Sequence, residues 1–302
     1  MLVKKIKGVQ SVHFESVLDV KPAVDALTGD NAKGKEYMTT YTGSGNSKWF
    51  GPTNKTGDDV YKHALLGDEV LYKEHLLPIT ETLNKELGNH TKSYRQAIKK
   101  VKRRKVKKDF GDEVDIHAIY QGNLDKAWRT TERVEVDSKH HLVTLVVDIG
   151  GNAVVSAIDS LWRTAVTLRL VDELQSAGKA VQVVVSGCSE RAFEDTSDLC
   201  LVTCTVKKYN ENLSMERLAG MTSLAFYRTF GFASKFVIGP KVRGNLGSSK
   251  SDSLDLIPLH VREDIEKGHT KAVIVKRADS LKTALTSLNI AYEQMKTFSD
   301  QD

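Results

Sequence analysis

In the second half of the chain, the apolar residues follow two patterns in turn: short continuous runs and helical spacing. The run His141–Asp148 is apolar and rich in β-branched residues, which is typical of a strand buried on both faces. From Val155 to Leu174, apolar residues recur at three- and four-residue spacing, which predicts one wide face of a helix, and Gly178 is expected to cap it in the left-handed conformation. The apolar run Val181–Ser186 predicts a second strand. Strand, helix and strand together indicate a βαβ unit and therefore a parallel sheet.

The pattern continues toward the end of the chain. Leu199–Val206 predicts a third strand, Lys271–Lys276 a late strand, and Met215–Phe230 a helix. Phe232–Ile238 fits either a fourth strand or an extension of the preceding helix. A last helix is expected from Asp279 onward. These elements predict an α/β fold: a Rossmann-like, mainly parallel sheet with helices on both faces.

The first hundred residues carry weaker signals. The segment from Val9 to Leu18 fits a strand or a short helix. Asp58 and Asp59 suit the first turn of a helix, where negative charge meets unpaired N–H groups. Further helical segments are expected up to Leu87. We therefore expect a mostly helical N-terminal region, residues 1–110, followed by an α/β domain, residues 111–302.

Composition limits the classes of protein to consider. The 302 residues are 40% hydrophobic and 27% charged, as in ordinary globular proteins. No apolar run approaches the roughly 18 residues that a membrane span needs, and the first residues lack the apolar core of a signal peptide. We therefore expect no membrane association. Cys188, Cys200 and Cys204 lie in or beside predicted strands, which favours reduced, buried thiols in a cytoplasmic protein, or in the host cytoplasm if a phage encodes it.

The net charge of +5 is concentrated in one segment. Residues 99–108, KKVKRRKVKK, hold eight basic residues, and the rest of the chain carries about −3. Such a cluster neutralises phosphates and predicts salt-sensitive, sequence-independent nucleic-acid binding. The alternative is a solvated linker, or a charged strand facing the acidic residues 112–115. The candidate nucleic-acid-binding residues are Lys99, Lys100, Lys102, Arg103, Arg104, Lys105, Lys107 and Lys108.

A polar turn follows the first central strand. Ligands of parallel sheets bind beyond the carboxyl ends of the strands, so we expect Asp148 at an accessible rim, with Gly150 and Asn152 beside it. The carboxylate of Asp148 and the amide oxygen of Asn152 are ligands that would hold Mg²⁺ weakly. The alternative is that Asp148 caps the next helix or accepts hydrogen bonds from N–H groups of its own turn.

The sequence VTLVVDIGGN, with its amphipathic helix and the strand after AGKAVQVVV, resembles the opening of a von Willebrand factor A-type domain. Such domains usually carry Asp-x-Ser-x-Ser at this turn, which binds Mg²⁺. Here Asp148 matches, whereas Gly150 and Asn152 replace the serines. Gly111–Trp128 resembles the segment before this domain in cobaltochelatase-type bacterial proteins, and Lys207–Ala233 is similar to a phage and bacterial family. The resemblance covers roughly residues 49–300.

The resemblance implies a function. It implies a non-enzymatic protein-interaction module with a degenerate metal-ion-dependent adhesion site. Because the resembled proteins work beside AAA+ ATPases, an AAA+ ATPase is an expected class of protein partner. The alternative is a nucleic-acid-binding protein that uses residues 99–108. An enzyme is least favoured, because no nucleophile–base or acid–base pair is visible in the sequence.

Overall fold

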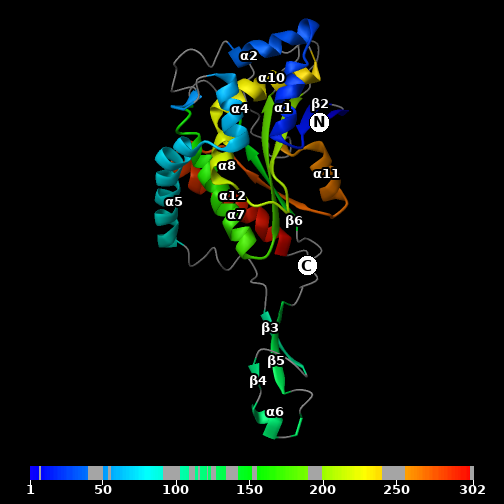
Figure 1. Ribbon diagram of the computed structural model, residues 1–302, viewed down its shortest axis with the longest axis vertical. Helices are drawn as coiled ribbons and strands as arrows, with labels where there is room; N and C mark the ends of the chain where they lie inside the picture. Colours follow the sequence, from blue (N-terminus) through cyan, green and yellow to red (C-terminus); the bar gives the residue numbers. More distant parts are fainter. Residues whose placement is uncertain are drawn as a thin grey trace.

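The chain folds around one large sheet, with a second, small sheet formed by its middle part (Figure 1). The large sheet has six strands in the order β1-β2-β8-β7-β6-β9. Its strands are β1 (Leu2–Ile6), β2 (Val9–Phe14), β6 (Leu142–Asp148), β7 (Ala180–Ser189), β8 (Leu199–Lys207) and β9 (Lys271–Val275). The structure is a computed structural model, and it describes residues 1–6, 8–39, 50–53, 56–90, 103–108, 113–114, 116–120, 122–123, 127–133, 142–151, 155–189, 199–239 and 256–299.

The direction of the strands confirms an α/β fold with a mostly parallel sheet. Strand β6 pairs in parallel with β7 and with β9, and β2 pairs in parallel with β8. However, β8 runs antiparallel to β7, and β1 runs antiparallel to β2, so the sheet is mixed. The prediction of a mainly parallel sheet is therefore confirmed, with antiparallel pairs at β7–β8 and β1–β2. Nine residues, 190–198, join these two strands, and a parallel crossover needs a dozen or more.

Side chains of β6 alternate between two apolar layers. Val143, Leu145 and Val147 belong to the larger core, which includes buried residues of α7 (Leu161–Ser176) and α12 (Leu281–Ser299). On the opposite face, Val146 packs in a smaller core with Val261 of α11 (Leu259–Glu266). Helices therefore cover both faces of the sheet at β6, as expected.

Helix α7 connects β6 to β7 and confirms the predicted βαβ unit. It begins at Leu161, six residues later than the apolar spacing indicated. It ends at Ser176, and Gly178, two residues later, has a φ of 79°. The N–H of Gly178 donates to the carbonyl of Gln175, and the N–H of Lys179 donates to that of Leu174. This is the predicted left-handed cap.

The predicted helix Met215–Phe230 is interrupted. It consists of α8 (Met215–Thr222), α9 (Leu224–Phe226) and the π-turn η5 (Tyr227–Gly231), and α10 (Phe232–Ile238) follows. Ser223 breaks the series with an extended ψ of 149°, and its hydroxyl accepts a hydrogen bond from the N–H of Phe226. The segment Phe232–Ile238 is therefore helical.

Strands β1 and β2 bring the start of the chain into the large sheet, beside β8. The large sheet thus takes strands from both sides of the boundary expected at residue 110. Helix α4 begins as expected, because Thr56 and Asp59 form a capping box. The helical elements of this region are η1 (Val17–Asp19), α1 (Val20–Asp25), η2 (Gly29–Lys35), α2 (Glu36–Thr39), α4 (Gly57–Leu66), η3 (Leu71–Leu76) and α5 (Leu77–His90).

The small sheet lies apart from the large one, at the bottom of Figure 1. Its strands, in the order β3-β5-β4, are all antiparallel: β3 (Arg103–Lys108), β5 (Trp128–Arg133) and β4 (Glu113–Val114). Between β4 and β5 lies α6 (Ile116–Tyr120), and Gly122, which follows it in the chain, has a φ of 72°. Among the described residues, no helix is both long enough and apolar enough to cross a bilayer.

Candidate functional site: the turn after strand β6

Asp148, the last residue of β6, is buried. It is 4% exposed, and its Oδ1 accepts a hydrogen bond of 2.8 Å from the N–H of Gly150. Burial raises the pKa of Asp148 to about 6, whereas the Gly150 bond and the charges of Arg163 and Arg277 lower it. The expectation of an accessible carboxylate at the rim was wrong. The alternative, in which Asp148 bonds to its own turn, is confirmed.

A distant helix causes this burial. A Cβ atom on Gly151 would lie 2.5 Å from Cδ2 of Leu224, so α9 packs directly on the turn. Leu224 is itself buried. Because Leu224 is 73 residues away from Gly151 in the chain, local patterning gave no sign of this contact.

A buried arginine from α7 holds the turn. Nη1 of Arg163 donates to the carbonyl oxygens of Asp148, at 3.3 Å, and of Gly150, at 3.0 Å. Nε and Nη2 donate to the carbonyl oxygen of Thr222, at 3.2 and 2.9 Å. One guanidinium thus joins the end of β6 to the end of α8. Burial lowers the pKa of Arg163 to about 10, so the group keeps its charge at neutral pH.

A second arginine supports the far side of the same turn. Arg228 of η5 is buried, and its Nη2 donates to the carbonyl oxygen of Val155 at 3.1 Å. Burial lowers the pKa of Arg228 to about 10. Sequence reasoning identified neither Arg163 nor Arg228. The available signal was local: each arginine stands alone among uncharged residues, in LWRTAV for Arg163 and in AFYRTF for Arg228.

The residues around Asp148 do not fit the Mg²⁺ ion that the resemblance implies. Asp148 offers one carboxylate, and Gly150 has no side-chain oxygen. Arg163 and Arg277 are near enough to act on the charge of Asp148, and they would repel a divalent cation. In the described part of the chain, no three His, Cys, Asp or Glu residues form a group that could hold a metal. Asn152 lies outside the described residues, so its role stays a prediction.

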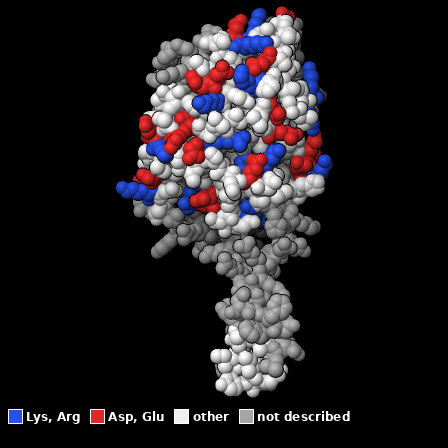
Figure 2. Space-filling view, viewed as in Figure 1, with Lys and Arg blue, Asp and Glu red and all other residues white. Residues whose placement is uncertain are grey.

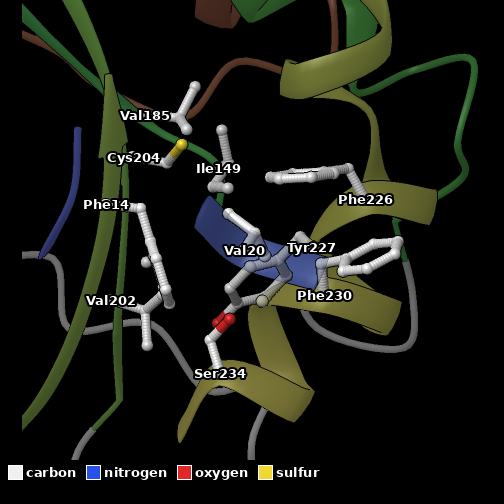
Figure 3. Close-up of a pocket in the computed structure, with 12 residues that line it drawn as sticks. Phe14, Val20, Ile149, Val185, Val202, Cys204, Phe226, Tyr227, Phe230 and Ser234 are labelled. Atoms are coloured by element: carbon white, nitrogen blue, oxygen red, sulfur yellow. The ribbon is translucent and has the colours of Figure 1, made fainter. Parts of the chain in front are cut away.

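The hollow next to this turn is too small for a substrate (Figure 3). Its volume is about 10 Å³, which is room for about one water molecule. Figure 3 shows Phe14 and Val202 on one side and the rings of Phe226 and Phe230 on the other. The lining is mainly apolar. The Oγ atom of Ser234, at its edge, has no hydrogen-bond partner among the described residues.

A buried lysine lies at the end of β7. Nζ of Lys235 donates to Oγ of Ser189 at 2.5 Å and to the hydroxyl of Tyr227 at 3.5 Å. Burial lowers the pKa of Lys235 to about 8. A serine beside a lysine is a nucleophile–base pair in some enzymes. Here all three side chains are inaccessible to solvent, so the contacts satisfy buried polar groups and offer no route for a substrate.

A larger, open hollow of about 400 Å³ lies between α4 and η3. At its base, Asp68 is buried and lies 3.2 Å from Nδ1 of His63. Asp68 also accepts hydrogen bonds from Thr53 Oγ1 and from the N–H of Leu71. These bonds fix the turn between the two helical elements, which is a structural role.

Part of the basic run forms strand β3, where it pairs with β5 rather than with the acidic residues 112–115. In the register of this pair, Arg103 pairs with Arg133 and Lys107 pairs with Arg129. Glu113 pairs with Arg129 from the other edge of β5. The alternative prediction of a charged strand is therefore confirmed, but its predicted partner, the acidic residues 112–115, was wrong. Of the predicted residues, Arg103, Arg104, Lys105, Lys107 and Lys108 are in β3, and Lys99, Lys100 and Lys102 lie outside the described residues.

The three cysteines are buried and free, as expected. Burial raises the pKa of the Cys200 thiol to about 12 and also raises that of Cys204. Both thiols are therefore protonated at neutral pH, and thiolate chemistry is disfavoured.

Comparison with known proteins adds a family. Residues 4–297 match a family described as Domain of unknown function (DUF7192). The match extends across residue 110, where the sequence suggested a domain boundary. No curated protein and no solved structure matches the chain.

Proposed function

We propose that this chain, which belongs to the DUF7192 family of domains of unknown function, is a non-enzymatic protein-interaction module. The observation that carries the proposal is a group of exposed apolar residues on the small sheet and its helix. Val114, Ile116, Ile119 and Tyr120 are 44%, 62%, 43% and 85% exposed. We call these four residues the apolar tip. Exposed apolar side chains that cluster on a surface mark a binding site, whereas single exposed apolar side chains are common and need no explanation.

The spacing of the tip residues favours a protein partner. Ile116, Ile119 and Tyr120 are three and four residues apart on α6, so they share one face of that helix. Ala118, between them, is buried. Helices with such spacing bind by inserting apolar anchors into a groove of another protein. Three of the four tip residues are aliphatic, whereas stacking on nucleic-acid bases requires aromatic side chains.

The positive charge of residues 99–133 predicts a second property of the partner. Residues 99–133 contain eleven Lys and Arg against six Asp and Glu, a net charge of +5, which equals the net charge of the whole chain. On the face of the body in Figure 2, basic and acidic residues are intermixed. A partner with an apolar groove and an acidic rim would complement the tip. An AAA+ ATPase, the partner class that the resemblance implies, is the first class to test.

The von Willebrand factor A type of the sheet is part of the proposal. It is supported by the position of Asp148 and Gly150 at the carboxyl end of β6, between the parallel strands β7 and β9. A bound Mg²⁺ ion is not part of it, because the surroundings of Asp148 do not fit one. The turn is thus a degenerate adhesion site in this proposal, and the partner binds elsewhere.

Site-specific cross-linking tests the proposal. A photoreactive amino acid replaces Tyr120 in the full chain, and the cross-linked protein is identified, purified and used in binding measurements. Ile119→Asp is expected to weaken its affinity about 10- to 100-fold, because a charge would enter the apolar groove. Leu18→Asp is the matched control: Leu18 is 56% exposed on η1, away from the tip, and its substitution should leave affinity unchanged. Equal affinity of the parent and Ile119→Asp would contradict the proposal.

A nucleic-acid-binding function is the second candidate, and the register of β3 with β5 favours it. The register pairs Arg103 with Arg133 and Lys107 with Arg129, so basic positions stand opposite one another along β3 and β5. A two-stranded antiparallel ribbon can enter the major groove of DNA, and β3 and β5 form such a pair, with the short β4 on the other edge of β5. In electrophoretic shift assays this function predicts binding that is lost at about 0.3 M salt and with the Arg103, Lys105 and Lys107→Gln triple variant, but kept with Ile119→Asp. The opposite pattern favours the protein partner.

A further inference from the structure

Three backbone carbonyl oxygens surround one positive charge inside the molecule. They belong to Asp148 and Gly150, at the end of β6, and to Thr222, at the end of α8. The carboxylate of Asp148 lies close enough to interact with the same charge. Carbonyl and carboxylate oxygens are the ligands that Ca²⁺ and Mg²⁺ prefer. In this chain, however, the positive charge is the guanidinium of Arg163.

We propose that Arg163 is a built-in cation that takes the place of a divalent metal ion and locks the turn after β6 without one. The turn and the end of α8 are then held together by a group covalently attached to α7. This inference is independent of the apolar tip and of the proposed function.

The shape of the guanidinium suits the position. Its planar fork donates from one edge to Thr222 and from Nη1 to the two carbonyls of the turn. The carbonyl of Thr222 is one of the last four of α8, which have no partner within their helix. A cation at a helix C-terminus also interacts favourably with the helix dipole. The hydroxyl of the next residue, Thr164, reinforces the link, because it lies 2.6 Å from that of Thr222.

Loss of the guanidinium would change the turn in a specific way. The carbonyl oxygens of Asp148, Gly150 and Thr222 would lose these hydrogen bonds, and the carboxylate of Asp148 would lose a neighbouring positive charge. Buried unpaired acceptors and an uncompensated buried carboxylate are both destabilising. The vacated space would be lined by hard oxygen atoms, and of the two guanidinium groups that act on Asp148 only that of Arg277 would remain. A small divalent cation would therefore become more favourable there than in the parent chain.

Thermal unfolding with added CaCl₂, MgCl₂ or EDTA tests the inference. The parent chain should show the same Tm in all three solutions, and calorimetry should detect no bound Ca²⁺ or Mg²⁺. Arg163→Ala should lower Tm by about 10 °C, and millimolar Ca²⁺ should restore part of this loss. The added substitution Asp148→Asn should abolish the Ca²⁺ response.

Arg228→Ala is the matched control, because Arg228 is also buried and supports the same turn through Val155. It should lower Tm without any response to Ca²⁺. If Arg163→Ala does not fold, Arg163→Gln provides the same comparison. A Ca²⁺ or Mg²⁺ ion bound by the parent chain and lost in Asp148→Asn would overturn the inference. So would an Arg163 variant that is as stable as the parent, or one that responds to Ca²⁺ no more than Arg228→Ala does.

Discussion

Lys235 illustrates, at the scale of one residue, how the interior accommodates a charge. Its ammonium contacts the hydroxyls of Ser189 and Tyr227 and lies 5.0 to 5.3 Å from the ring centroids of Phe232 and Tyr227. These hydroxyls and rings stabilise the ammonium less than water does, so burial lowers the pKa of Lys235 to about 8 from the usual 10.5. Between these two values the unfolded chain binds more protons than the folded chain. Lys235 therefore makes stability rise as pH rises from about 8 to 10.5.

The Lys235→Met variant should remove this rise. Met fills a similar volume without a charge, so at pH 7 the variant is expected to be at least as stable as the parent. The parent should gain up to about 3 kcal/mol relative to the variant between pH 8 and 10.5. Urea denaturation at pH 7, 8, 9 and 10 measures both chains. A constant difference between them across this range would show that Lys235 does not titrate there.

Helices α4 and α8 show, at the scale of elements, how closely two backbones approach. A Cβ atom on Gly220 of α8 would lie 2.4 Å from the carbonyl oxygen of His63 in α4. Only glycine permits this contact, because a backbone atom cannot move aside as a flexible side chain can. The approach also brings the N-terminus of α8 onto the α4–η3 turn, where the N–H of Asp68 donates to the carbonyl of Glu216.

Substitution of Gly220 by Ala should therefore separate the two helices, with a loss of about 1–3 kcal/mol in the free energy of unfolding. Gly88→Ala is the matched control, because Gly88 lies in α5 and a Cβ atom there meets no atom within 4 Å. Ala at that position should stabilise the chain by up to about 1 kcal/mol through helix propensity. Urea midpoints report both changes. A Gly220→Ala midpoint equal to that of the parent would disprove the close contact.

Elements whose pattern lies within a few neighbouring residues could be predicted from the sequence, and features that depend on distant residues could not. The runs that form β6, β7, β8 and β9 were predicted because an apolar strand is visible within eight residues. The undecided segment Phe232–Ile238 is helical, and periodicity alone does not distinguish a fully buried helix from a strand in seven residues. The burial of Asp148 was missed because Leu224 and Arg163, which cover and hold its turn, become neighbours only after folding.

At the scale of the whole molecule, β2 and α11 bring two histidines together across the second face of the sheet. The rings of His13 and His260 lie 4.0 Å apart between centroids, and Nδ1 of His13 lies 2.9 Å from Oγ1 of Thr203. Burial, His260 and the N-terminal amine lower the pKa of His13 to about 3. Burial also lowers the pKa of His260. The folded chain thus resists protonation that the unfolded chain accepts below about pH 6.5.

The burial of His13 should therefore destabilise the fold in acid, whereas Asp148, whose pKa is raised to about 6, acts in the opposite direction below that pH. His13 alone is expected to cost about 2 kcal/mol between pH 7.5 and 5, because each pH unit below 6.5 costs about 1.4 kcal/mol until pH 3. His13→Asn, which keeps a polar amide toward Thr203, should lose less stability over this range. His269→Asn, an exposed position, should behave as the parent does. Denaturant unfolding at the two pH values decides, and an equal acid loss in His13→Asn and the parent would refute the role of His13.

The register of β3 with β5 has a consequence for how the gene can be altered. Arg103 and Arg133 pair directly, so the polypeptide leaves the small sheet beside the place where it entered. The segment behaves topologically as a cassette within the chain, between α5 and β6. Its excision would leave two ends close enough for a short splice, and its sequence can be grafted between the strands of an unrelated hairpin.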